Sequence, residues 1–347
     1  MSVTTNDAEA FMNAKAQPAG ALGHLQKVAV QLCVLQQTYS PVVESPVCLV
    51  FCGDHGITKA GPAAGPSAYP REVTELMYQT VVQGRAAVAV LCATHQVTCA
   101  CIDVGIDSDR ESQTRLARGT NDMTAGPAMS IDLCKEAIQL GRDTAKRYIL
   151  EKGKDAVCIG ELGIGNTTAA SALVAAFTGA PARDVCGRGT GLDDAGVERK
   201  VRVVEAALST NAAALKAGPL ETVAAVGGLE IAAMAGAMLE AASRRVAVVV
   251  DGFISGAAAL CARRLEPALP SDAFFFSHQS DEKGAVILLQ ALNGVAPLQM
   301  NMRLGEGTGA VLCVPLLKSA AAILQDMTTL DAVVRGEMKP NDKIAVE

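Results

Sequence analysis

Tryptophan is absent from this 347-residue sequence, and aromatic residues make up only 3% of it. Hydrophobic residues nevertheless account for 50%, so the core must be built mainly from Ala, Val, Leu and Ile, which pack closely without large rings. The 32 glycines agree with many turns and close helix–sheet contacts. A chain of this length predicts one large domain with a smaller one attached, or two domains.

An excess of basic residues is also lacking, since the net charge is -6. This argues against a general nucleic-acid binder, which needs a basic face to neutralise phosphates, but it does not exclude a small anionic ligand. No apolar run avoids glycine and charge for long enough to predict a membrane span. The N-terminus lacks the basic and apolar parts of a signal peptide, so we expect a cytoplasmic protein.

The sequence has eleven cysteines but no CxxC pair, which argues against a zinc or thioredoxin-type site. Cysteines inside apolar runs are expected to be buried free thiols. These are Cys48, Cys52, Cys158 and Cys313. Cys99 and Cys101 share one face of a predicted strand, where a reactive pair is an alternative.

Continuous apolar runs that end in polar residues indicate buried parallel strands. Polar residues follow these runs at Asp54, Asp103, Glu161 and Asp251. Helical patterns lie before, between and after the strands, over 21–37, 85–93, 130–150, 168–177 and 314–325. The alternation predicts an α/β fold, a parallel Rossmann-like sheet with helices on both faces, and ligands in such folds bind beyond the carboxyl ends of the strands. We expect residues 1–40 and 315–347 to form a small helical domain and 41–314 to form the large α/β domain that carries the site.

The segment 160–170 (GELGIGNTTAA) combines a strand end, a glycine-rich turn and the start of an Ala-rich helix. Free amides at a helix N-terminus bind phosphate, and glycines let the backbone approach it. Gly163, Gly165, Asn166 and Thr167 are therefore candidate phosphate ligands. Asn166 or Thr167 is equally compatible with a simple N-cap. The segment is not a Walker A loop, because no Gly-Lys-Ser/Thr follows, and it lacks the spacing of a dinucleotide fingerprint.

Two later loops are candidates for the rest of a phosphate cradle. The loop 187–194 holds Gly189 and precedes Lys200, although a flexible surface turn would have the same composition. The segment 277–284 offers the Ser280 hydroxyl. His278 in the same segment suggests acid–base chemistry, but a lone histidine beside a loop is more often structural or at the surface.

Two acidic positions suggest catalysis. Glu306 lies between Gly305 and Gly307, where partial desolvation would raise its pKa and make it a better base; the alternative is a turn glutamate facing water. Asp54 and His55 follow a predicted strand and are compatible with a metal site, a catalytic dyad or a purely structural loop.

Taken together, these segments resemble the nicotinate-nucleotide:5,6-dimethylbenzimidazole phosphoribosyltransferase family of cobalamin assembly. Several of the matching segments are long, and they run in the family's order from about residue 17 to 325. They are 53–56 (GDHG), 102–107 (IDVGID), 160–163 (GELG), 166–168 (NTT), 227–230 (GGLE), 251–253 (DGF), 277–280 (SHQS), 282–285 (EKGA) and 303–307 (RLGEG).

The resemblance implies transfer of the 5-phosphoribosyl group of nicotinate mononucleotide to a lower-ligand base, which gives an α-ribotide and nicotinate. It implies that Glu306 is the catalytic base and that Glu161 lies in the same site. Phosphate contacts are implied at Gly163, Gly189, Lys200 and Ser280 and at amides around Asn166 and Thr167. The acceptor slot is implied at Tyr69, Met77, Leu162 and Leu304. Neither a metal nor a cofactor is implied, and the family works as a dimer with residues of both chains near each site.

The chain departs from the family at two places. The N-terminal motif Lys-Pro-Pro-Gly-Ser-Leu-Gly-Arg-Leu-Glu becomes QPAGALGHLQ at 17–26. Tyr69 and Met77 stand where some members carry Ser and Gln, so hydrogen bonding to the acceptor should differ. Some similar proteins use phenol or p-cresol and pair two unlike subunits, so a phenolic acceptor and either a homodimer or a heterodimer remain open.

Two other functions stay as alternatives. The chain is also compatible with a non-catalytic partner subunit, although such a partner would have no need of both glutamates. A dinucleotide oxidoreductase is disfavoured because no Gly-x-Gly-x-x-Gly occurs early in the chain.

Overall fold

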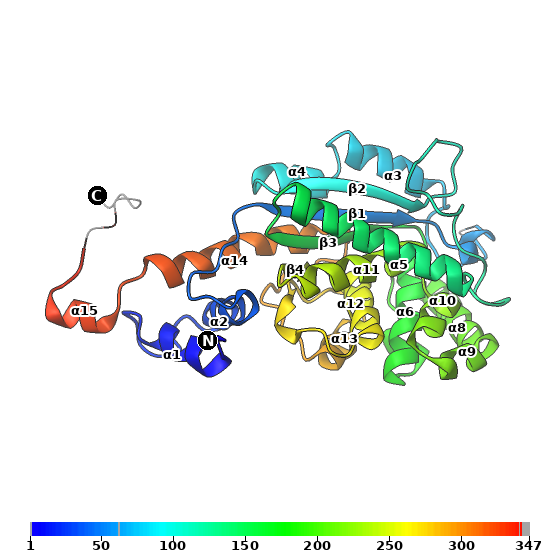
Figure 1. The fold of residues 1–347 in the computed structure, drawn as a ribbon. Coiled ribbons are helices and arrows are strands. Elements are labelled where there is room, and N and C mark those ends of the chain that lie inside the picture. The colour runs from blue at the N-terminus through cyan, green and yellow to red at the C-terminus, as the bar shows by residue number, and fades with distance from the viewer. Residues whose placement is uncertain (1, 62, 340, 342–347) are drawn as a thin grey trace.

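The computed structural model describes residues 2–61, 63–339 and 341. Its centre is a five-stranded, wholly parallel sheet with the order β2-β1-β3-β4-β5 (Figure 1). The strands are β1 (Pro46–Gly53), β2 (Thr98–Gly105), β3 (Ala156–Leu162), β4 (Ala247–Val250) and β5 (Phe274–Phe276). The predicted parallel α/β sheet is therefore confirmed.

Burial explains why the strand sequences are continuous apolar runs. Every residue of β1, β3 and β4 is buried, because helices cover both faces of the sheet. The short strand β5 was not predicted, since three consecutive phenylalanines carry no period from which a strand can be recognised.

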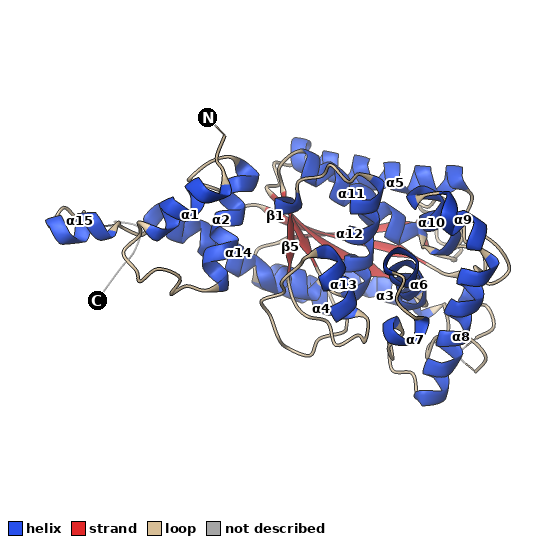
Figure 2. Ribbon diagram, turned by 90° about the horizontal axis from the view of Figure 1, so that it is seen from below, coloured by secondary structure: helices blue, strands red, loops and turns tan. Residues whose placement is uncertain are grey.

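Helices form a layer on each face of the sheet. One face is covered by α11 (Leu229–Ser243) and α12 (Phe253–Leu265), and α5 (Ile131–Lys146) packs on the outside of α11. The other face is covered by α3 (Val73–Val82), α4 (Ala87–Thr94) and α14 (Thr308–Asp326). Figure 2 shows the strands enclosed between the helices.

Glycine lets α5 and α11 approach unusually closely. A Cβ atom on Gly141 would overlap the carbonyl oxygen of Ala233, and one on Gly236 would overlap that of Ile138. Both positions therefore require glycine, in agreement with a core made from small residues.

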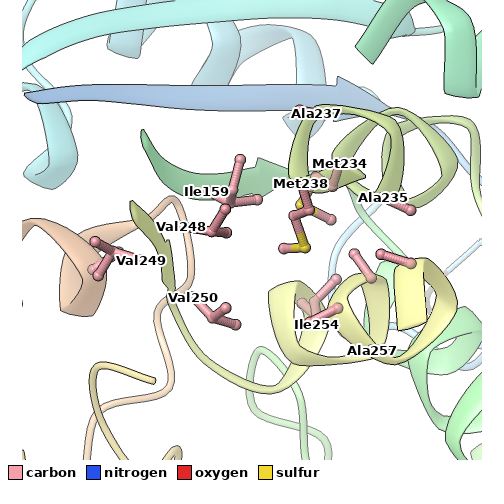
Figure 3. Packing of buried hydrophobic residues seen from close by; sticks show 14 of the residues in the cluster. Ile159, Met234, Ala235, Ala237, Met238, Val248, Val249, Val250, Ile254 and Ala257 are labelled. Atoms are coloured by element: carbon pink, nitrogen blue, oxygen red, sulfur yellow. The ribbon is translucent and has the colours of Figure 1, made fainter. Parts of the chain in front are cut away.

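The core between β3, β4 and the first helical layer is filled by aliphatic side chains, alanines and methionines. Figure 3 shows Met234 and Met238 of α11 lying between Ile159 and Ile254. Methionine has a flexible thioether that fills irregular gaps, which compensates for the shortage of aromatic rings.

The remaining helices agree with the sequence patterns only in part. The predicted helices 21–37, 85–93 and 168–177 correspond to α2 (His24–Gln36), α4 and α6 (Asn166–Thr178). The prediction for 130–150 was too uniform, because α5 gives way to a π-helical turn, Arg147–Glu151. The other elements are α1 (Thr5–Asn13), α7 (Ala182–Val185), α8 (Asp194–Thr210), α9 (Ala212–Ala217), α10 (Pro219–Val226), α13 (Ala285–Leu292), α15 (Leu330–Arg335) and the 3-10 turns Gly56–Thr58 and Ser271–Ala273.

Helices from the two ends of the chain lie side by side. α2 packs against both α1 and α14, and Lys15 Nζ donates a hydrogen bond to the carbonyl oxygen of Met327, 2.9 Å away. Figure 1 shows these helices at one end of the molecule, beyond the sheet. The division into a small domain (1–40 and 315–347) and a large one stays a prediction, and residues 340 and 342–347 lie outside the described part.

Two segments are long and apolar enough to cross a membrane by length and composition alone, namely Val73–Thr94 and Thr308–Asp326. The first consists of α3 and α4 with Gly84 between them. The second, α14, contacts α2, α4 and strands of the sheet. Packing within the protein thus accounts for much of the apolar character of α14, whereas the apolar side chains of Leu76, Val82 and Val90 in the first segment are exposed.

The cysteines are all free thiols, as predicted. Nine are buried, and only Cys99 and Cys101 are partly accessible. These two do not form a pair with each other in the structure. Cys101 Sγ lies 3.3 Å from Cys52 Sγ on the neighbouring strand.

Candidate active site

The turn before α14 is held by Asp251, which follows β4. The backbone N–H groups of Gly307 and Ala310 donate to its two carboxylate oxygens at 3.1 and 3.0 Å. A carboxylate at a helix N-terminus satisfies free amides and interacts favourably with the helix dipole. Gly305, Glu306 and Gly307 all have left-handed backbone angles, with φ of 86°, 63° and 90°.

Glu306 is only 4% exposed, so the alternative of a turn glutamate facing water is wrong. Burial raises the pKa of its carboxyl, while the backbone N–H of Val88 in α4, 3.5 Å from Oε2, acts in the opposite direction. A buried carboxylate with a raised pKa has the properties required of a general base near neutral pH.

Glu161 lies near the end of β3 and is 4% exposed. Burial first, and then the charges of Asp251 and Glu230, raise the pKa of its carboxyl to about 8. The side-chain amide of Asn166 donates a hydrogen bond to Oε2 and opposes this shift. Gly305 stands opposite, and a Cβ atom there would overlap Oε1.

The glycine-rich turn after β3 leads into α6 at Asn166. The N-cap is Gly165, with a φ of 98°, and no side chain caps the helix. The interpretation of Asn166 or Thr167 as the N-cap is therefore wrong. Their side chains are used elsewhere, Asn166 on Glu161 and Thr167 on Lys200.

Lys200 of α8 is completely buried. Its Nζ donates to Thr167 Oγ1 at 2.9 Å and to the carbonyl oxygen of Gly187 at 3.3 Å. Gly189 lies beside both groups, since a Cβ atom there would be 3.0 Å from Thr167 Oγ1 and 3.6 Å from Lys200 Nζ. Burial lowers the pKa of Lys200, and the negative charge of Glu282 counteracts this. The tertiary structure thus gathers residues from three separate segments that the sequence suggested for one phosphate cradle.

A small cavity of about 20 Å³ lies beside Thr167 and Glu161. It is lined by Glu161, Thr167, Gly252, Ser280, Glu282 and Arg303, among others. A second cavity, of about 530 Å³, adjoins it, and both are lined by Glu282 and Arg303. A larger cavity of about 930 Å³ is lined by α2 and β5 and contains none of the predicted site residues, so size alone does not identify the site.

His278 is buried rather than at the surface. Its Nδ1 lies 3.1 Å from Ser277 Oγ and 3.7 Å from Asp251 Oδ1. A Cβ atom on Gly309 would overlap the ring, so the imidazole packs directly against the first turn of α14. This favours the structural interpretation of His278.

Asp54 and His55 do not form a catalytic dyad. Asp54 accepts hydrogen bonds from Thr74 Oγ1 at 2.6 Å and from the backbone N–H of Asp107 at 2.8 Å. His55 Nε2 instead lies 2.7 Å from Glu230 Oε1 in a buried pair. Both contacts favour the interpretation that these residues hold the loops, and no group of three or more potential metal ligands occurs within the described ranges.

The four residues of the predicted acceptor slot are not brought together by any cavity described above. Tyr69 and Leu304 are exposed, Leu162 is buried, and Met77 is partly buried. Their role as a slot stays a prediction.

Comparison with known proteins shows the family of this chain. A family model described as "Phosphoribosyltransferase" matches residues 2–334. Nicotinate-nucleotide–dimethylbenzimidazole phosphoribosyltransferase of Ralstonia nicotianae is 42% identical over 95% of this chain and 93% of its own length. That of Pseudomonas putida is 43% identical over 90% and 89%.

The chain belongs to the nicotinate-nucleotide–dimethylbenzimidazole phosphoribosyltransferase family. It is an enzyme of the pentosyltransferase class. The crystal structure of CobT from Thermus thermophilus has the same fold, with a TM-score of 0.88 at 37% identity over 95% of this chain and 98% of that one.

Three buried acidic residues near this candidate site were not singled out from the sequence. Asp251 was noted as a polar strand end and as part of a matching motif, and Glu230 and Glu282 only as parts of matching motifs. Their contacts join segments that are far apart in the sequence, so no local pattern distinguishes them from surface carboxylates.

Proposed function

We propose that this enzyme transfers the 5-phosphoribosyl group of nicotinate mononucleotide to an aromatic acceptor and releases nicotinate. The observation that carries the proposal is the assembly of Thr167, Gly189 and the buried Lys200 beside Glu161. A buried cation with a hydroxyl and glycine amides suits a phosphate, and the adjacent carboxylate suits a positively charged centre. The names of the relatives agree with this donor.

The chemistry places different demands on the two glutamates. The nicotinate ring of the donor is already a pyridinium, so it leaves without acid assistance. The C–N bond to the ribosyl carbon breaks with its electron pair going to the ring, and charge develops on the sugar. A carboxylate at Glu161 stabilises that charge. Binding of the cationic ring favours the ionised form of Glu161, whose pKa in the free protein is about 8.

Glu306 takes the proton of the acceptor nucleophile as the new bond to the ribosyl carbon forms. Its burial supports this role, because a desolvated carboxylate is a stronger base. We assign the phosphate to Gly163, Gly165, Asn166, Thr167, Gly189, Lys200 and Ser280. We assign the acceptor to Tyr69, Met77, Leu162 and Leu304.

The acceptor is a cobamide lower-ligand base, dimethylbenzimidazole or a phenolic compound such as phenol or p-cresol. Tyr69 and Met77 favour an apolar contact over hydrogen bonding. Nicotinate release from nicotinate mononucleotide with dimethylbenzimidazole, adenine or phenol tests the proposal. No release with any acceptor, either alone or with a homologous partner subunit, refutes it.

We further propose that the protein is cytoplasmic and works as a dimer, either with itself or with a homologous subunit. Light scattering of the purified chain tests the homodimer, and a monomer would exclude it. If the chain is instead a silent partner, Glu306→Ala leaves the activity of the purified complex unchanged.

A further inference from the structure

Glu282 is a buried carboxylate beside the candidate site that has no role in the proposed chemistry. It is 6% exposed, and neither of its carboxylate oxygens has a hydrogen-bond partner among the described residues. A buried carboxylate without donors is costly, and such a group in a native protein calls for a function.

The side chain of Glu282 faces two adjoining cavities. Its side chain lies in the wall shared by the two adjoining cavities, one lined by Glu161, Thr167 and Ser280 and the other by Gly187 and Arg188. Gly187 has no side chain to intervene, since a Cβ atom there would overlap Glu282 Oε2.

Lys200 does not satisfy this carboxylate. Its Nζ donates to Thr167 Oγ1 and to the carbonyl oxygen of Gly187, and no bond joins it to Glu282. The charge of Glu282 still acts on Lys200, because it favours the protonated lysine against the effect of burial. Glu282 therefore keeps its acceptor capacity for another group while it lies near the phosphate cradle.

We propose that Glu282 binds the vicinal ribosyl hydroxyls of the donor nucleotide. This inference rests on the proposed function, since the phosphate at Thr167 and Lys200 and the reacting carbon beside Glu161 leave the sugar between them. Two adjacent O–H donors match two free carboxylate oxygens, and hydrogen bonds to a charged acceptor are stronger than neutral ones. Glu282 is thus a specificity-determining residue that distinguishes a ribosyl from a deoxyribosyl donor.

The experiment compares nicotinate mononucleotide with its 2′-deoxy analogue as donors for the wild-type enzyme and Glu282→Gln. We expect the wild type to prefer the ribosyl donor by roughly 10- to 100-fold in kcat/KM, and Glu282→Gln to lose most of that preference. Gly187→Ala should act in the same direction by displacing Oε2. Asp281→Asn removes a neighbouring charge whose side chain is 55% exposed, and it should leave the preference intact.

Other outcomes overturn the inference in distinguishable ways. If Glu282 serves only as the counter-charge of Lys200, Glu282→Gln weakens both donors equally and the preference survives. If Glu282→Gln does not fold, Glu282→Asp and Gly187→Ala supply the same comparison, and an unchanged preference in both refutes the role. A wild-type enzyme that releases no nicotinate from either donor instead refutes the proposed function on which the inference rests.

Discussion

Gly160 in β3 directly supports the turn that carries Glu306, and Gly160→Ala is the most specific test of that arrangement. A Cβ atom at Gly160 would lie 2.6 Å from the backbone nitrogen of Gly307 and would overlap the carbonyl oxygen of Glu306. Both neighbours are backbone atoms, so no side-chain rotation can relieve the contact. Since such atoms settle at about 3.5 Å, the turn must retreat by roughly 1 Å.

The size of the effect follows from this displacement. Adding a methyl group to a packed core costs about 1–3 kcal/mol of stability. Misplacing a catalytic group by about 1 Å can lower the rate roughly 100-fold, which corresponds to about 2.7 kcal/mol in the activation barrier. We expect a folded protein with a kcat about 100-fold lower. KM for nicotinate mononucleotide should change little, because the turn that must retreat, 305–307, contains neither Thr167 nor Lys200.

Nicotinate release measured with a saturating acceptor, together with thermal unfolding, checks this prediction. Gly126→Ala is the matched control, because a Cβ atom there meets nothing within 4 Å and the backbone is not left-handed. A folded Gly160→Ala protein with the same kcat as Gly126→Ala would refute the idea that this contact positions Glu306.

Three further predictions concern ionisable groups. Glu306→Gln should lower kcat by about 10²- to 10⁴-fold. Because burial raises the pKa of Glu306 above 4.5, the rate of the wild-type enzyme should rise with pH through a value above 4.5. A Glu306→Gln variant whose rate rises with pH in the same range would contradict the assignment. Glu161 keeps its proton to a pH of about 8 in the folded state against 4.5 when unfolded, so its contribution to stability is complete below pH 4.5 and lost as pH rises through 8. Urea unfolding at pH 6 and 8.5 should therefore show Glu161→Gln gaining stability relative to the wild type at the higher pH, and a constant difference would disprove the shift. Lys200→Met should raise KM for nicotinate mononucleotide by roughly 10- to 100-fold while circular dichroism stays native, and an unchanged KM would remove Lys200 from the phosphate site.

The burial of Glu306 shows where sequence analysis of this chain reached its limit. A glutamate between two glycines is locally indistinguishable from a solvated turn. It becomes buried because Gly160, Asp251 and α4 surround it, and these lie more than 50 residues away in the chain. The same reason applies to Glu282. Its carboxylate oxygens lack hydrogen-bond donors because Gly187 has no side chain and because Lys200 donates to other groups.

The sequence by itself determined the parallel α/β sheet and the relationship to phosphoribosyltransferases. Apolar runs, glycine turns and the long motifs are local features, and fully buried parallel strands leave a continuous signature. It did not determine the three-residue strand β5 or the π-helical turn after α5, because both are too short to have a period. Only the tertiary structure decided that Asp251 holds the Glu306 turn and that His55 pairs with Glu230. It also decided that Lys200 donates a hydrogen bond to Thr167. Those contacts join distant segments, and their hydrogen bonds and desolvation exist only once the strand ends have come together at one edge of the sheet.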